Sequence, residues 1–238
     1  IASGYTLFLN FQINKQREEM LKRIKIYIKR IGILYIIWTI IYIPFAVYDY
    51  QNNDLGFIYD LVLFIRGMVF IGDHFYSWPL WYLLSLFYSL LIIYYLLLKS
   101  KSIIYIFICS MIFFILSLIL NQFLDVNYQN GFLGKITYLF SYTFGSGRLF
   151  IGFSYVMIGV ILANYNTEVY SNKGKLLFFI ILVIAIYFQI YPTIFISKLL
   201  FILIVTSIFK YSLSLKLNND KLGYWLRKCS TVMYFTHM

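Results

Sequence analysis

The segment GDHFYSWPLWYLLSLFYSLLIIYYLLLKSK, residues 72–101, joins a polar and aromatic lead-in to a long apolar run that ends at two lysines. Its apolar part, Leu80–Leu98, is long enough to cross the roughly 30 Å of hydrocarbon in a bilayer as one helix. The whole chain agrees, because 62% of its residues are hydrophobic, only 12% are charged and the mean hydropathy is +0.80, whereas about a quarter of the residues in a soluble domain are charged. The sequence therefore predicts an integral membrane protein.

Other apolar runs have a similar length. Ile31–Tyr48 and Ile103–Leu120 each match the roughly 17–25 residues that a span needs. Leu149–Ala163 is shorter, but it extends through Arg148 and Asn164. These three runs are therefore predicted to cross the membrane as well.

The long apolar run Leu176–Phe209 is a different case. As one helix it would measure about 51 Å, which is too long for a single crossing. Tyr191-Pro192 interrupts it near the middle, and proline removes a backbone donor and crowds the preceding turn. We expect a helical hairpin with the halves Leu176–Gln189 and Thr193–Phe209.

Both ends of the sequence resemble interrupted spans. Residues 1–11, IASGYTLFLNF, are typical of the second half of a membrane helix, and Leu222–Met238 begins a span without room to finish. We therefore expect an all-α, polytopic transmembrane helix bundle, truncated at both ends. It would hold about eight spans or part-spans in a single domain over residues 1–238.

The positions of lysine and arginine predict the orientation. Of the 20 basic residues, four lie on one side of this map, namely Arg66, Lys135, Arg148 and Lys198. The other sixteen lie on the opposite side, which should therefore face the cytoplasm. The net charge of +11 is spread between apolar spans instead of along one face of a soluble domain, so it indicates a lipid bilayer and no nucleic acid as partner. The two cysteines form no disulfide or metal-binding pattern.

Two longer segments, residues 49–79 and 121–147, are then extracytoplasmic. In the first, YDLVLFIRGMVFIG is apolar but carries Asp60 and Arg66, which favours a helix in or dipping into the outer face over another crossing. The second is rich in Gly, Tyr and Ser and is expected to form loops. Together these segments are candidates for the roof of a cavity.

Histidine is rare in this chain, and His237 lies about nine residues past Lys228. Along a helix that is roughly 13–14 Å from the cytoplasmic edge. An imidazole at this depth usually faces the bundle interior or a watery cavity, where it can shuttle a proton. A histidine hydrogen-bonded between helices is the structural alternative.

The other histidine, His74, follows Asp73 at the outer mouth of the Trp78–Leu98 helix, ahead of Trp81. A carboxylate beside an imidazole can orient it as a general base. Adjacent residues do not automatically face one another, so a solvated loop pair is the favoured reading. Trp81 is expected to pack or anchor at the rim of a cavity.

Cations mark two further candidate sites. Arg148 begins a predicted span on the outer side, where a guanidinium can hold an anion, stabilise charge on a reacting carbonyl, or reach to the interface. On the cytoplasmic side, the cluster from Lys15 to Arg30 is suited to anionic lipid.

Five segments of the chain resemble, in order, the motifs of the acyltransferase 3 family of multispanning membrane acyltransferases. They are IASGYTLF at residues 1–8, KRIKIYIKRIGILYIIWTIIY at 22–42, WPLWYLLSLFY at 78–88, RLFIGFSYVMIGVILA at 148–163 and CSTVMYFTH at 229–237. The resemblance implies a ten-helix bundle. It also implies transfer of an acyl group, often acetyl, from cytoplasmic acyl-CoA to a hydroxyl of a cell-surface or lipid-linked carbohydrate.

The resemblance also implies roles for particular residues. The family carries an Arg and a catalytic His in its first helix, which would precede residue 1, so the fragment alone is expected to be inactive. Within this sequence His237 and Arg148 are the catalytic candidates. The substrate-binding candidates are Arg23, Lys29, Arg30, Asp73, His74, Trp81 and Tyr234. Acyl-CoA is the expected donor substrate, and no bound cofactor or metal is expected.

Two other function classes fit an all-helical membrane protein. A proton-coupled transporter or flippase would use His237 as a proton relay, although the sequence contains no internal repeat or paired broken helices to favour it. A noncatalytic membrane module of a larger protein is the third class.

Overall fold

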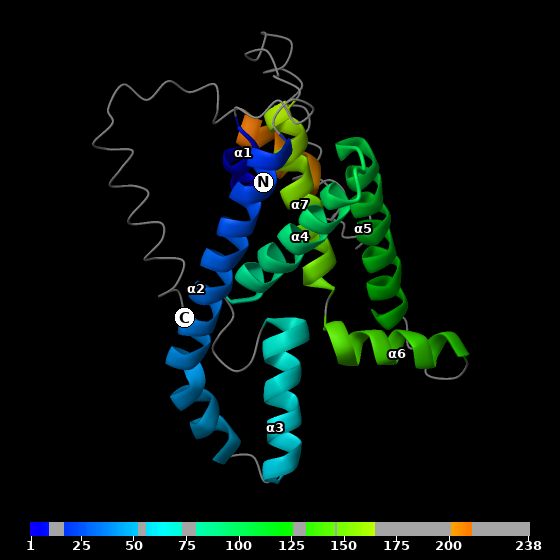
Figure 1. Cartoon of the computed structure of the whole chain (residues 1–238). Coiled ribbons are helices and arrows are strands. Elements are labelled where there is room, and N and C mark those ends of the chain that lie inside the picture. The colour runs from blue at the N-terminus through cyan, green and yellow to red at the C-terminus, as the bar shows by residue number, and fades with distance from the viewer. Residues whose placement is uncertain are drawn as a thin grey trace.

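The computed structural model describes residues 1–9, 17–51, 56–72, 80–125, 132–145, 147–164 and 201–210, and every regular element in this part of the chain is a helix. The elements are α1 (Ala2–Phe8), α2 (Arg17–Gln51), α3 (Phe57–Arg66), the π-helix η1 (Gly67–Ile71), α4 (Leu80–Leu98), α5 (Ile103–Asp125), α6 (Phe132–Phe144) and α7 (Arg148–Asn164) (Figure 1). A further apolar helix covers Phe201–Lys210. The predicted all-α helix bundle is confirmed.

The exposed side chains of helix α2 change from basic to apolar along its length. One stripe of the helix is buried along its whole length, at Met20, Ile24, Ile31, Tyr35, Thr39, Tyr42 and Ala46. These positions repeat at helical spacing, as expected for one face packed against neighbours. The exposed side chains are mostly basic from residue 22 to residue 30 and mostly apolar from residue 33 to residue 48. Exposed apolar side chains on a long helix are what contact with lipid tails requires.

Helix α7 is the centre of the bundle, because α1, α4 and α5 all pack against it. Small residues permit these close approaches, as in other membrane helix pairs. An added Cβ on Gly159 would lie 2.7 Å from the backbone nitrogen of Tyr5 in α1. On the α5 side, the Ser154 hydroxyl donates a hydrogen bond of 2.8 Å to the carbonyl oxygen of Ser110.

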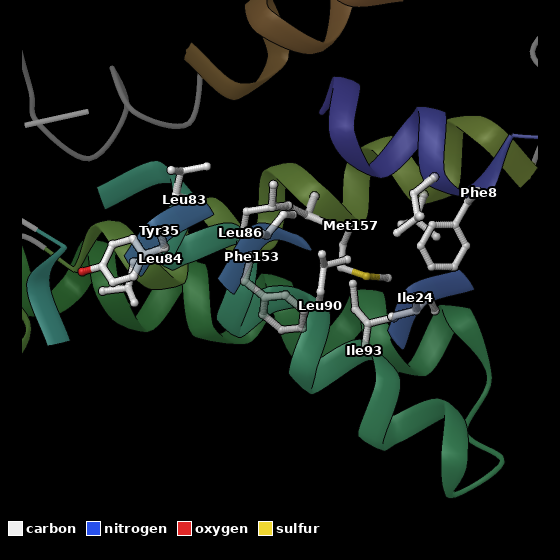
Figure 2. Packing of buried hydrophobic residues seen from close by; sticks show 14 of the residues in the cluster. Phe8, Ile24, Tyr35, Leu83, Leu84, Leu86, Leu90, Ile93, Phe153 and Met157 are labelled. Atoms are coloured by element: carbon white, nitrogen blue, oxygen red, sulfur yellow. The ribbon is translucent and has the colours of Figure 1, made fainter. Parts of the chain in front are cut away.

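The hydrophobic core lies between α4, α7 and the buried stripe of α2 (Figure 2). Leu86, Leu90 and Ile93 of α4 are buried beside Phe153 and Met157 of α7. α4 packs against both α2 and α7 and so joins the two. It therefore has fewer lipid-facing residues than α2.

The described helices agree with several predicted spans. α4 has the predicted bounds, and α7 extends from Arg148 to Asn164 as expected. By length and composition, Arg17–Tyr48 and Leu80–Leu98 are able to cross a membrane, and so is the bent pair Gly134–Phe144 and Arg148–Asn164 if it forms one span. α5 covers the predicted span Ile103–Leu120. The predicted hairpin around Pro192 lies outside the described residues, apart from Phe201–Lys210.

The second outer segment differs from its prediction as loops. Residues Phe132–Phe144 form the helix α6, which is bent by 69° from α7 (Figure 1). Its aromatic residues explain the difference, because Phe144 contacts both Phe70 of η1 and Phe150 of α7, at ring-centroid distances of 5.9 Å and 5.3 Å. Packing across the bundle stabilises a helix that the glycine-rich composition did not indicate.

Candidate functional site

The candidate site is built around the π-helix η1, which continues α3 and then stops abruptly. Its last turn closes with a hydrogen bond of 2.7 Å from the backbone nitrogen of Gly72 to the carbonyl oxygen of Gly67. Gly72 has φ 71°, a left-handed conformation that favours glycine. Single π turns inside helices are frequent at functional sites.

Two tyrosines from other helices complete this helix end. The last carbonyl groups of a helix have no partner within it, and an unpaired carbonyl is costly where water is scarce. The hydroxyl of Tyr35 in α2 donates to the carbonyl oxygen of Met68 at 2.6 Å, and that of Tyr88 in α4 donates to Val69 at 2.8 Å. α2 and α4 therefore fix the place where η1 ends.

The end of η1 lies directly against the first turn of α4. An added Cβ on Gly72 would be only 2.5 Å from the Cα of Trp81. The guanidinium carbon of Arg148, at the start of α7, lies 5.8 Å from the centroid of the Trp81 ring. That distance is within the range of a cation–π interaction. Two predicted site residues, Arg148 and Trp81, are thus brought together.

The turn between α6 and α7 places Arg148 there. Gly145 has φ 58° and Gly147 has φ 65°, so the chain bends through two left-handed positions that a residue with a side chain rarely adopts. An added Cβ on Gly145 would be in ordinary contact with the Ile71 side chain, at 3.4 Å. The turn therefore lies beside η1, and α7 begins next to α4.

A second arginine lies at the other end of η1. Arg66 is the last residue of α3, and its guanidinium carbon lies 4.6 Å from the centroid of the Tyr142 ring in α6. The Nε of Arg66 is buried and has no hydrogen-bond partner. The sequence placed Arg66 on the outer side but gave no signal that a distant tyrosine would pack against it.

The basic candidates Arg23, Lys29 and Arg30 are exposed on α2 and are not part of the cluster around Arg148. At the start of α2, the Arg17 guanidinium donates to the carbonyl oxygen of Leu98 at 3.0 Å, and also to that of Leu97.

The same helix contacts the middle of α4 further along. An added Cβ on Gly32 would be 3.2 Å from the Phe87 ring. Phe87 precedes Leu98 by eleven residues, or about 16 Å of helix. Since Arg17 lies at the Leu98 end, residues 23–30 run beside the half of α4 that ends at Leu98.

Four candidates, Asp73, His74, Tyr234 and His237, lie outside the described residues. Their proposed roles stay predictions. The residues that sequence reasoning missed are Tyr35, Tyr88 and Arg66. Tyrosine is so frequent in this chain, with 24 examples, that composition alone could not single out the two that cap η1.

The fold, together with the cluster of Arg148 and Trp81 at the end of η1, defines the class of the protein. It is an all-α membrane protein with polar residues clustered at helix ends. Within that class, the model of the acyltransferase 3 family, described as an acyltransferase domain, matches residues 1–238. No curated protein and no solved structure matches the chain. Because the family match covers the whole sequence, the chain belongs to the acyltransferase 3 family and is in general terms a membrane acyltransferase.

Proposed function

We propose that the full protein transfers an acyl group, in the first instance acetyl, from cytoplasmic acyl-CoA to a hydroxyl of a cell-surface or lipid-linked carbohydrate. The observation that supports this most is the position of Arg148 over Trp81 at the start of α4, whereas the basic face of α2 lies beside the half of α4 that ends at Leu98. Family membership supplies the reaction class. The acceptor would then bind near the start of α4, and the donor near the end of α4 at Leu98.

The donor would bind on the basic side. Acyl-CoA carries several phosphate charges and does not cross lipid, so it must meet the protein from the cytoplasm. The protein would be a multi-pass protein of the cell membrane with its basic loops cytoplasmic. Arg23, Lys29 and Arg30 are exposed there and suited to phosphate. The thioester would enter the bundle past Tyr234 and His237.

The acceptor would bind on the opposite side, beneath Arg148, where the sequence also predicts Asp73 and His74. Its hydroxyl oxygen attacks the thioester carbonyl carbon, the carbon–sulfur bond breaks, and coenzyme A leaves as the thiol. A base takes the hydroxyl proton and passes it to the departing sulfur, and we assign this role to a histidine, either the one the family carries in its first helix or His237. The Arg148 guanidinium stabilises the oxyanion that forms on the carbonyl oxygen.

The test uses membranes that carry the full-length protein and radiolabelled acetyl-CoA. Label is expected on surface or lipid-linked carbohydrate, and Arg148→Ala should reduce it about 10²–10³-fold, the usual loss for one oxyanion donor. His237→Ala should also reduce it. The matched control is Lys135→Ala, because Lys135 is an exposed cation in the neighbouring helix α6 and contacts neither Trp81 nor η1 in any described interaction.

Protein abundance is measured in every variant, so that loss of folding is separated from loss of chemistry. Unchanged labelling with Arg148→Ala would remove this residue from the mechanism. An intact protein that labels no acceptor with any acyl-CoA would refute the proposed reaction.

A further inference from the structure

Arg66 carries a charged group that the described part of the chain satisfies only in part. Its Nε is buried and lacks a hydrogen-bond partner. A buried donor on a charged group is costly when unpaired, more so than a neutral one. Asp60, the acid of the same helix, also has a buried oxygen without a partner, so α3 does not pair the two charges.

The surroundings of Arg66 favour one chemistry. The Tyr142 ring covers one side of the guanidinium, at 4.6 Å from its carbon to the ring centroid. A guanidinium whose face is covered by a ring can still donate from its edge. The edge formed by its two terminal nitrogens matches a carboxylate or a phosphate, which it binds through two parallel hydrogen bonds. The Nε itself is enclosed, but the side chain as a whole is only partly buried, so such a ligand can reach the terminal nitrogens.

The position of Arg66 connects it to the acceptor side of the proposed reaction. Arg66 precedes η1 directly, and Gly72 follows η1 in contact with Trp81. Gly72 is six positions after Arg66, which is under about 10 Å along a helix. A sugar bound beneath Arg148 would therefore lie about the length of η1 away from Arg66.

We infer that Arg66 is an anion-binding residue for the acceptor, and that the acceptor is a carbohydrate with a carboxylate or phosphate group. This inference rests on the proposed function, and it adds the charge class of the acceptor. Arg148 acts at the reacting carbonyl, whereas Arg66 holds a charged group of the acceptor away from the reacting hydroxyl. An anionic lipid headgroup has the same chemistry, so the experiment must separate it from the acceptor.

The experiment uses the full-length protein in vesicles of zwitterionic lipid. Equilibrium binding is measured for three alkyl glycosides with the same chain, a neutral glucoside, a glucuronide and a glucoside phosphate. Wild type should bind at least one anionic glycoside ten-fold or more tightly than the neutral one, and this preference should disappear in Arg66→Gln. Arg66→Lys keeps the charge but not the two-donor edge and should retain part of the preference. Lys135→Gln, which removes another outer cation, should leave it unchanged.

A second measurement repeats acetyl transfer with the same three glycosides. Arg66→Gln should raise the KM for the anionic acceptor and leave kcat and the KM for acetyl-CoA near their wild-type values, a separation that general misfolding would not produce. Equal binding of neutral and anionic glycosides by wild type, or a preference that survives in Arg66→Gln, overturns the inference. So does a defect of Arg66→Gln that appears only when anionic lipid is added to the vesicles, because Arg66 would then bind a headgroup.

The binding measurement needs no catalysis, so the two proposals fail separately. If the protein transfers no acyl group yet shows the charge preference, the proposed function is wrong and the anion site stands. If it transfers acetyl equally to all three glycosides and binds them equally, the proposed function stands and the anion site is wrong.

Discussion

The contact between Gly152 of α7 and Ser85 of α4 should set the distance between these two helices. An added Cβ on Gly152 would clash with the Ser85 hydroxyl and would lie 2.9 Å from the Ser85 Cβ, whereas ordinary contact begins near 3.4 Å. The hydroxyl cannot move away freely, because it donates to the carbonyl oxygen of Leu149 at 3.1 Å. Gly152→Ala must therefore break this hydrogen bond and also separate the helices by about 0.5–1 Å.

The cost follows from these two effects. Overpacking in a well-packed core costs about 1–3 kcal/mol, and a lost hydrogen bond about 0.5–1.5 kcal/mol. We expect Gly152→Ala to lower the free energy of unfolding by about 2–4 kcal/mol. Gly32→Ala is the matched control, since its nearest neighbour is the Phe87 ring at 3.2 Å, and we expect a loss below about 1 kcal/mol.

The assay measures unfolding of the full-length protein in detergent by titration with a denaturing detergent. Ser85→Gly removes the obstructing atoms. The double variant with Gly152→Ala should therefore lose less free energy of unfolding than the sum of the two single losses, by about 1 kcal/mol or more. Acyl transfer should fall in Gly152→Ala and recover in part in the double variant. The reason is that Arg148 lies one turn before Gly152, and misplacing a catalytic group by about 1 Å can lower the rate about 10²-fold. Wild-type stability of Gly152→Ala, or strict additivity in the double variant, would refute this account of the spacing.

Three further perturbations test other parts of the structure. Tyr35→Phe and Tyr88→Phe each leave a carbonyl of η1 unpaired, and each should lower the free energy of unfolding by about 1–3 kcal/mol in the same titration; wild-type stability of both would contradict their role as caps. Asp60→Asn removes a charge from a buried carboxyl with an unpaired oxygen, so thermal denaturation should show unchanged or higher stability. Clear destabilisation would indicate that another group pairs with the carboxylate. Cysteine labelling from outside the cell should reach a substitution at Asn53 but not one at Asn172, and the opposite pattern would invert the topology.

The local sequence was enough to predict the fold class and several helices. A run of apolar residues as long as Leu80–Leu98 satisfies its backbone groups internally as a helix, apart from those of the end turns, so its bounds follow from length and composition. Arg148 marks the start of α7 for the same reason, because the apolar run begins directly after it. The change from basic to apolar exposed residues along α2 is also visible without any partner helix.

Contacts between distant segments were decided only by tertiary structure. Nothing near Tyr35 or Tyr88 in the sequence indicates that their hydroxyls cap the same π-helix, 33 and 19 residues away. α6 was expected to be loop, since its stability depends on aromatic contacts with η1 and α7 and not on its own composition. The physical reason is that helix formation in a membrane is determined locally by backbone hydrogen bonding, whereas the pairing of polar groups such as Arg148 with Trp81 depends on which helices pack together.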